Sequence, residues 1–284
     1  MNSVLRLLPR PLQIILTVVL LTIVGAPVGY VFLASINTDL AVAAGGVWPE
    51  QVSFQNYARI WSTVPLGRGL ANSLLVAGTV ALACAVVAVF SAHVLVRHAF
   101  RGRRTVLRAL LGMQSIPGTL LLLPVFVLFA TVGNTVGVPT IGTRWSLFVT
   151  YLTFGLPFST WIMVTYLRQL PDELTEAARI DGAGTWQILL RIVIPLSWPG
   201  LVVAAIFAFL LGWNDVLFAS VMTDVDTRTA AVVLQVFGAS QEGGAIPPYG
   251  QMMAAAIVCA APVVTLYLAF QRYIVNGLTA GGVK

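Results

Sequence analysis

The sequence has very few charged residues, and this scarcity excludes most soluble folds. Only 9% of its 284 residues are charged, whereas 58% are hydrophobic. The mean hydropathy is +0.91, and ordinary soluble domains carry about 25% charged residues. We therefore expect an all-α integral membrane protein surrounded by membrane lipid.

Cysteine and histidine are also scarce, which removes the usual signs of a metal site. Cys84 and Cys259 lie inside apolar runs, where we expect them to act as small hydrophobic residues. No CxxC pair and no His/Cys cluster occurs, so we expect no metal. His93 and His98 flank Arg97 at the end of an apolar run, where anchoring at the membrane interface is favoured over a proton relay.

Signatures of catalysis and of nucleotide or nucleic-acid binding are missing as well. The phosphate-binding pattern GxxxxGK[ST] occurs nowhere, so the sequence offers no such loop for holding ATP phosphates. No set of residues suggests a catalytic site, and we expect neither an enzyme nor a cofactor in this chain. The net charge is +6, but the basic residues do not line up beside aromatic ones, which argues against nucleic-acid binding.

Long hydrophobic runs are what the sequence has in abundance. A membrane-spanning helix needs about 20 mostly apolar residues to cross roughly 30 Å of hydrocarbon. The first run is too long for the apolar core of a cleaved signal peptide. We expect six transmembrane helices within a membrane domain of 12–275, with short ends at 1–11 and 276–284. The six runs lie at about 12–35, 70–96, 106–131, 146–168, 198–222 and 250–271.

The basic residues between these runs predict the orientation of the chain. Four of the 16 Lys and Arg residues fall in segments on one side of the membrane: Arg59, Arg68, Arg144 and Arg228. The remaining twelve fall at the two ends and after the second and fourth runs. Because basic residues collect on the cytoplasmic side, we expect a multi-pass protein with both termini in the cytoplasm.

One stretch between the fourth and fifth runs differs from everything around it: EAARIDGAGTWQILLRIVIPLSW, residues 176–198. Just before it, Pro171, Asp172 and Glu173 suit the start of a helix, since acids there complement the helix dipole. The pattern predicts a small-residue face on this helix. That face consists of Leu174, Ala177, Ala178 and Asp181.

Gly182 and Gly184 interrupt this helix, and a second one follows. We expect a bend that requires, at Gly182, backbone angles or a close approach that a side chain forbids. Thr185 suits the cap of the second helix, and Pro195 suits its end. Its expected apolar face is Trp186, Leu189, Leu190 and Val193.

Two interpretations of residues 170–197 stay open from these residues alone. An amphipathic helix can lie on the membrane surface without a partner. Alternatively, the small residues and the fixed bend suit an element that docks onto another protein.

The same stretch carries a motif. Glu176-Ala177-Ala178, Asp181-Gly182-Ala183, Ile192 and Pro195 resemble the EAA motif of permease subunits of ATP-binding-cassette (ABC) importers. From about residue 50 onward the chain resembles the carbohydrate branch of that family, the binding-protein-dependent transport system inner membrane components. Within it, the chain is most similar to the second permease of maltose- and trehalose-type importers. Further matches are FQNYARIW, NSLLVAG, IPGTLLLLP, LPFSTWIM, WND and QRYIVNGLTAGGVK.

This resemblance implies a fold and a function. The fold is the ABC importer permease (MetI-like) fold, with six transmembrane helices and a cytoplasmic coupling helix seated in a groove of a separate ATPase. The function is half of the transmembrane pathway for a di- or oligosaccharide in a prokaryotic plasma membrane. A permease for another solute, such as glycerol phosphate, and a stand-alone secondary transporter are the alternatives.

The resemblance also implies partners and coupling residues. The partners are a second EAA-type permease forming a heterodimer, two ATPase subunits that bind ATP and Mg²⁺, an extracytoplasmic solute-binding protein and the sugar. The implied coupling residues are Glu176, Ala177, Ala178, Arg179, Asp181, Gly182, Ala183 and Pro195.

Two further sites are expected outside this motif. Asp215 is the only acid placed within a span, directly after Trp213 and Asn214. The three residues either line the sugar path, since a carboxylate in lipid is costly and usually functional, or lie wet near the outer interface. The tail, 276–284, is either a frayed end or, as the resemblance implies, enters the ATPase dimer interface through Gly281, Gly282 and Lys284.

Overall fold

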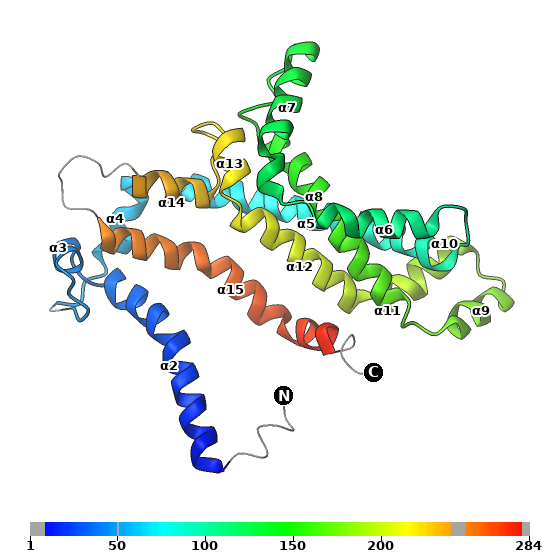
Figure 1. Cartoon of the computed structure of the whole chain (residues 1–284), viewed down its shortest axis with the longest axis horizontal. Coiled ribbons are helices and arrows are strands. Elements are labelled where there is room, and N and C mark those ends of the chain that lie inside the picture. Colours follow the sequence, from blue (N-terminus) through cyan, green and yellow to red (C-terminus); the bar gives the residue numbers. More distant parts are fainter. Residues whose placement is uncertain (1–8, 50, 240–247, 280–284) are drawn as a thin grey trace. The chain divides into compact units, whose positions relative to one another are not determined.

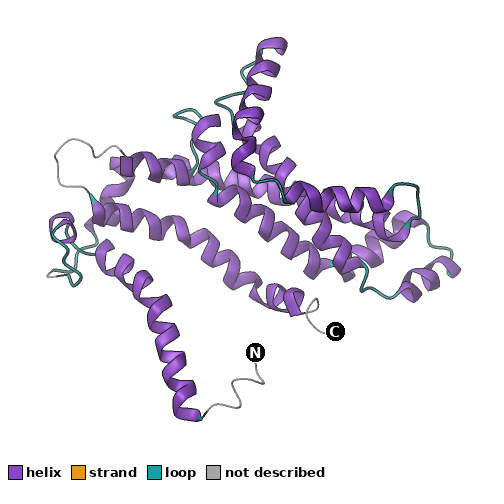
Figure 2. Ribbon diagram, in the orientation of Figure 1, coloured by secondary structure: helices purple, strands orange, loops and turns teal. Residues whose placement is uncertain are grey.

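The computed structural model describes residues 9–49, 51–239 and 248–279, and these form helices joined by loops (Figure 1). No strand is present among them (Figure 2). One isolated β-bridge joins Gly142 to Thr223. The all-α fold predicted from the sequence is confirmed.

The chain divides into two compact units, each described here by itself. The first comprises Met1–Leu66 and Leu234–Ala261, and the second comprises Gly67–Val233 and Pro262–Lys284. Helices α2 (Arg10–Ser35), α3 (Asp39–Ala43) and α4 (Gln55–Thr63) belong to the first unit. The division falls near the start of α5 (Leu66–Arg97) and inside α14 (Ala230–Ala239) and α15 (Tyr249–Thr279).

Within the first unit, polar side chains join the short helices to the start of α15. The Asp39 carboxylate accepts a hydrogen bond from the amide nitrogen of Gly250 at 2.8 Å. The Thr63 hydroxyl donates to the side-chain oxygen of Gln251 at 2.8 Å. The Asn56 amide donates to the backbone carbonyls of the last residue of α2, Ser35, and of Asn37 just beyond it. Helix α2, by contrast, buries none of its most apolar stretch in the described chain.

The second unit contains most of the helices. After α5 come α6 (Arg103–Gln114), a 3₁₀ turn (Gly118–Leu121), α7 (Leu122–Val136) and α8 (Arg144–Leu167). The segment between the fourth and fifth predicted spans forms α9 (Asp172–Ile180), α10 (Thr185–Ile188), a π turn (Leu189–Val193) and α11 (Ile194–Leu196). Then follow α12 (Trp198–Asn214) and α13 (Leu217–Met222).

Most of the six predicted spans are confirmed. Five described helices are long and apolar enough to cross a membrane, and a bent pair of helices raises the number to as many as six. The prediction of one span over 106–131 is wrong, because the chain breaks between α6 and α7 and the span-like helix covers Gly118–Val136. Pro117 disfavours helical angles at the residue before it, which accounts for the break.

The prediction of one span over 198–222 is also wrong in detail. Helix α12 ends at Asn214, and α13 begins only at Leu217. Asp215 is extended at this break, and its carboxylate accepts a hydrogen bond from the amide nitrogen of Ala219 at 3.0 Å. The carboxylate therefore supplies an acceptor to a free N–H group of α13.

Helices α5, α8 and α12 pack closely because glycine occupies the points where they approach. A Cβ atom added at Gly155 would lie 3.0 Å from the sulfur of Cys84, and one added at Gly200 would lie 2.7 Å from the ring of Tyr166. At Gly212 it would lie 3.1 Å from the ring of Tyr151. Small residues at such approaches are typical of membrane helix interfaces. Cys84 is fully buried here, as expected for a small hydrophobic residue.

The contact between α8 and α12 predicts the effect of adding one methyl group. Gly200→Ala should lower the thermal unfolding midpoint of the purified chain in detergent, because overpacking costs about 1–3 kcal/mol. The control is Gly78→Ala on α5, where an added Cβ meets nothing within 4 Å. Equal midpoints for the two variants would show that the tight contact is not required.

Candidate functional site

The first helix of the bent segment (residues 170–197) is fixed at its start. Pro171 precedes α9, and Asp172 and Glu173 lie in its first turn while Arg179 lies in its last, as the helix dipole favours. Arg97, at the end of α5, forms an ion pair with Asp172. Its guanidinium also donates to the carbonyl of Leu170 at 3.3 Å. The end of α5 therefore holds the entry to α9.

The bend is a Schellman motif. Gly182 has a left-handed φ of +84° and donates its N–H to the carbonyl of Arg179 at 3.0 Å. The N–H of Ala183 reaches back to the carbonyl of Ala178 at 2.9 Å. These two bonds satisfy carbonyls that the end of the helix would otherwise leave free.

The sequence predicted that Gly182 is required either for its backbone angles or for a close approach, and the structure distinguishes these two requirements. A Cβ atom at this position would meet nothing within 4 Å. The requirement is therefore the positive φ, which is costly for any residue with a side chain.

The second helix is present, but two details of its prediction are wrong. Gly184, not Thr185, precedes its first turn, and the N–H of Gly184 donates to the side-chain oxygen of Gln187 at 3.0 Å. Pro195 does not end the helix, which continues to Leu196. The π turn just before Pro195 widens the helix, so that the proline ring avoids the carbonyl of Arg191.

The helix turns sharply after Ser197. The Ser197 hydroxyl and amide both donate to the carbonyl of Val193, at 2.7 Å and 2.9 Å. The run from Thr185 to Leu196 then meets α12 at 73°. The bent segment is thus joined directly to a helix that packs in the core of the second unit.

The predicted apolar face of the second helix is only partly right. Leu189 and Val193 are buried together with Ile188. Trp186 and Leu190 are exposed instead, although the ring of Trp186 touches the edge of Phe90 on α5. The π turn departs from the spacing of 3.6 residues on which the prediction rested, and it turns Leu190 away from the core.

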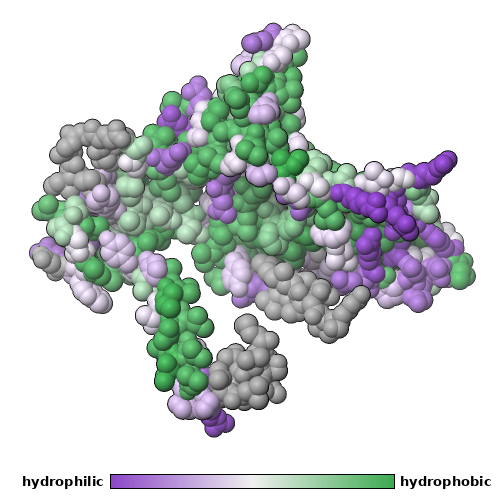
Figure 3. All heavy atoms as spheres, viewed as in Figure 1, coloured by the Kyte–Doolittle hydropathy of each residue, from purple (hydrophilic) through white to green (hydrophobic). Residues whose placement is uncertain are grey.

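The bent segment exposes apolar side chains in hydrophilic surroundings. Ile180, beside the bend, is 87% exposed and Trp186 is 67% exposed. Hydrophilic residues gather over α6, α9 and α10, whereas most of the other visible surface is hydrophobic (Figure 3). Contiguous exposed apolar patches are typical of contact surfaces, whereas single exposed apolar residues are ordinary. The exposed apolar side chains of the segment include Leu174, Ala177, Ile180, Trp186, Leu190 and Leu196.

The residues of the EAA motif lie on different sides of the first helix. Ala177 and Asp181 are exposed, and Ala178 and Ala183 pack against the core. Glu176 and Arg179 line a small cavity beside the end of α5. The structure therefore separates the motif into an outward side and a side that faces the rest of the second unit.

A larger cavity of about 740 Å³ lies among α6, α8, α12 and α13. Asp215 lines it and accepts a hydrogen bond from the hydroxyl of Tyr151 at 2.7 Å. Its other polar lining residues are Gln114, Thr119 and Thr153, and Phe154, Phe158, Phe207 and Phe218 add aromatic rings.

The three residues predicted to line the sugar path, Trp213, Asn214 and Asp215, do not all face this cavity. Trp213 is buried and stacks on Phe209 with ring centroids 5.3 Å apart. Asn214 is exposed at the end of α12. Of the three residues, only Asp215 lines the cavity.

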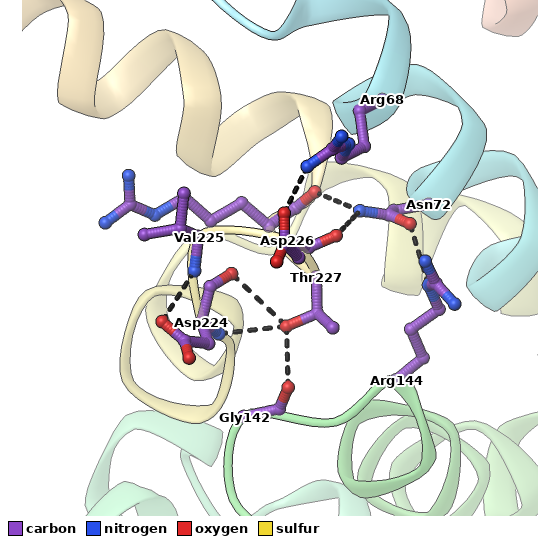
Figure 4. Close-up of polar contacts among 9 residues, drawn as sticks. Arg68, Asn72, Gly142, Arg144, Asp224, Val225, Asp226 and Thr227 are labelled. Atoms are coloured by element: carbon purple, nitrogen blue, oxygen red, sulfur yellow. Dashed lines mark hydrogen bonds and ion pairs between the residues drawn. The ribbon is translucent and has the colours of Figure 1, made fainter.

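A polar clamp that sequence reasoning missed fixes the loop 223–229 (Figure 4). Asn72, on α5, donates to the carbonyls of Asp226 and Arg228 at 3.0 Å and 2.9 Å. Its side-chain oxygen accepts from Arg144, at the start of α8, at 2.7 Å. Asn72 is buried, so each of these bonds replaces one to water. The sequence signal that could have indicated this contact is the single asparagine, Asn72, at the start of an apolar run.

Further contacts complete this clamp. The Thr227 hydroxyl lies 2.8 Å from the carbonyl of Gly142, and the Ser73 hydroxyl accepts from the amide of Ala230 at 2.9 Å. The exposed ion pair between Arg68 and Asp226 adds little, because water screens such pairs. The loop between α13 and α14 is thereby held as a defined surface.

No group of three His, Cys, Asp or Glu residues that could hold a metal ion occurs in the part of the chain that the structure describes. The predicted tail residues Gly281, Gly282 and Lys284 lie outside the described residues.

Comparison with known proteins gives consistent results. Residues 84–280 match the family model described as "Binding-protein-dependent transport system inner membrane component". The chain is 32% identical to the trehalose transport system permease protein of Mycobacterium tuberculosis, over 91% of this chain and 92% of the relative. It is also 32% identical to the trehalose/maltose transport system permease protein of Thermococcus litoralis, over 98% of each chain.

A solved structure shares the fold. A chain from a bacterial ABC transporter involved in the import of the acidic polysaccharide alginate aligns with a TM-score of 0.75 at 22% identity, over 94% of this chain and 98% of that one.

The bend predicts a specific effect of substitution at Gly182. Gly182→Val should break the Schellman motif, since a left-handed conformation costs a residue with a side chain about 1–2 kcal/mol. Amides of 181–183 should then exchange hydrogen faster in detergent, while the spans stay protected. Gly184→Val is the matched control, because φ at Gly184 is −70°. Unchanged exchange in the Gly182 variant would show that the bend does not depend on glycine.

Proposed function

We propose a function for this chain on the premise that it belongs to the family of binding-protein-dependent transport system inner membrane components, which its sequence matches over most of its length. The ABC importer permease fold expected from the sequence is confirmed. We propose that the chain is the permease subunit of an ATP-driven importer and forms half of the transmembrane pathway for a sugar.

The relatives support a sugar as the solute. Two at 32% identity are named for trehalose or for trehalose and maltose, and another, from Streptomyces coelicolor, is named for diacetylchitobiose at 31% identity. All three are named for di- or oligosaccharides. We therefore propose a solute of this class, without naming the sugar.

The exposed apolar side chains of the bent segment are the observation that carries the coupling role. Ile180 and Trp186 expose large apolar surfaces beside a rigid bend, and burying such surface against a protein is favourable. Arg97 ties α9 to α5, and Ser197 joins α11 to α12. A displacement of the bend by a bound partner is therefore transmitted to two core helices, α5 and α12. The occupant we propose is a separate ATPase, which binds the ATP and Mg²⁺.

The remaining partners follow from this assembly. We propose one second EAA-type permease, two ATPase subunits and a solute-binding protein at the outer loops. The distribution of basic residues supports the orientation we propose, with both termini and the bent segment in the cytoplasm. On that orientation the clamped loop 223–229 faces outward and offers the solute-binding protein a defined surface.

The cavity of about 740 Å³ is the proposed contribution of this chain to the sugar path. Sugar sites combine apolar faces with a few well-placed polar groups, and the aromatic rings around Tyr151 and Asp215 offer this combination. The tail at 278–284 is proposed to enter the ATPase dimer interface, as the family resemblance implies.

The proposal predicts the effect of a charge on the bend. Ile180→Glu should leave the fold unchanged, since the side chain is exposed, but it should weaken ATPase binding by placing a charge in an apolar contact. The tagged chain is purified in mild detergent from cells that express its natural partners. The ATPase retained with the chain, and sugar uptake by the cells, are then measured.

Two controls bracket this result. Ile180→Leu should retain the ATPase, and Val225→Glu, an exposed apolar position on the 223–229 loop, should retain it as well. Full ATPase retention and uptake by the Ile180→Glu variant would contradict the proposed contact. A homo-oligomer that imports sugar without any ATPase would defeat the function as a whole.

A further inference from the structure

A cavity of about 380 Å³ lies beside the bent segment and is unusually rich in arginine. It is enclosed by the ends of α5 and α8, the start of α6 and one side of α9. Its charged lining residues are Arg97, Arg103, Arg168, Arg179, Asp172 and Glu176. Four cations therefore face two carboxylates.

Among the residues that the structure describes, only one of these arginines has an ion-pair partner. Arg97 forms an ion pair with Asp172. For Arg103, Arg168 and Arg179, the described residues provide no ion pair and no side-chain hydrogen bond. Glu176 is the one carboxylate left to balance these three cations, so the cavity keeps an excess of positive charge.

Arg97 also carries an unsatisfied donor. Its side chain is only 10% exposed, and its Nε is buried without a hydrogen-bond partner among the described residues. A buried donor without an acceptor costs about 1–3 kcal/mol. Three arginines without ion-pair partners and a buried free donor suit a ligand with several acceptor oxygens and negative charge.

The position of the cavity indicates the source of such a ligand. Two helices that qualify as membrane spans end here, α5 at Arg97 and α8 at Leu167. Apolar Val96 and Leu170 lie in the same lining as the arginines. The ends of spans lie at the depth of lipid headgroups, and basic pockets between membrane helices bind anionic headgroups.

We propose that this cavity binds the phosphate of an anionic phospholipid headgroup. The planar guanidinium fork matches phosphate oxygens in a bidentate manner. The bound lipid joins α9 to the ends of α5 and α8 and to the start of α6, and so stiffens the base of the bent segment. Lipid binding requires neither the solute nor a bound ATPase, although Glu176 and Arg179 of the cavity also belong to the EAA motif.

Native mass spectrometry of the full-length chain in detergent, with dioleoylphosphatidylglycerol added, tests the proposal. Arg103→Gln and Arg168→Gln should each lower the fraction of chain that carries the lipid about fivefold, the effect of losing one cation near an anionic surface. Arg101→Gln, a matched change at an exposed residue outside the cavity lining, should not. Arg103→Lys and Arg168→Lys should retain most of the binding.

Competition separates the lipid from a soluble ligand. Inorganic phosphate at millimolar concentration should leave the bound phosphatidylglycerol in place. Displacement by phosphate would overturn the lipid assignment in favour of a soluble phosphate compound. Equal lipid occupancy in the chain and in the Arg103→Gln and Arg168→Gln variants, each eluting as a single folded species, would overturn the site itself.

Discussion

The need to satisfy every backbone hydrogen bond within the chain governs this structure. A break in a helix frees N–H and C=O groups that need local partners, most strictly in lipid, where water is absent. At 215–216 the carboxylate of Asp215 supplies one of them, for α13. At the bend of the bent segment, Gly182 and Ala183 supply two, and Ser197 supplies another before α12. The breaks are thus specific, and they coincide with the surfaces proposed to be functional.

These breaks provide a structural basis for the proposed coupling of a chain with so little charge to a separate ATPase. The bend sets a fixed angle between α9 and α10, and ion pairing through Arg97 ties α9 to α5. The 73° turn at Ser197 then passes directly into α12, which lines the larger cavity through Phe207 and Leu211. A displacement of Ile180 is therefore transmitted to the walls of the proposed pathway through packed helices.

Local patterns predicted much of this arrangement, and long-range contacts account for what they missed. The glycine at 182 was predictable, because a helical pattern interrupted by glycine between charged residues indicates a bend. The role of Pro195 was not, since whether a proline ends a helix depends on a π turn upstream that has no sequence signal of its own. The contact of Asn72 with Asp226 joins residues 154 positions apart, and no local spacing reveals such a partner. Trp213 looked like a pathway residue but is buried against Phe209.

The central claim, that the outward side of the bent segment seats in a separate ATPase, is tested most directly by site-specific crosslinking. A photoreactive amino acid is placed at Ala177, which is exposed on α9, in the complex assembled in membranes, and the crosslinked products are identified by mass spectrometry. A product joining this chain to the ATPase subunit, and changing in yield when ATP is added, is the predicted result. Products with lipid alone, unaffected by ATP, would show that the segment lies on the membrane surface and would contradict the coupling role.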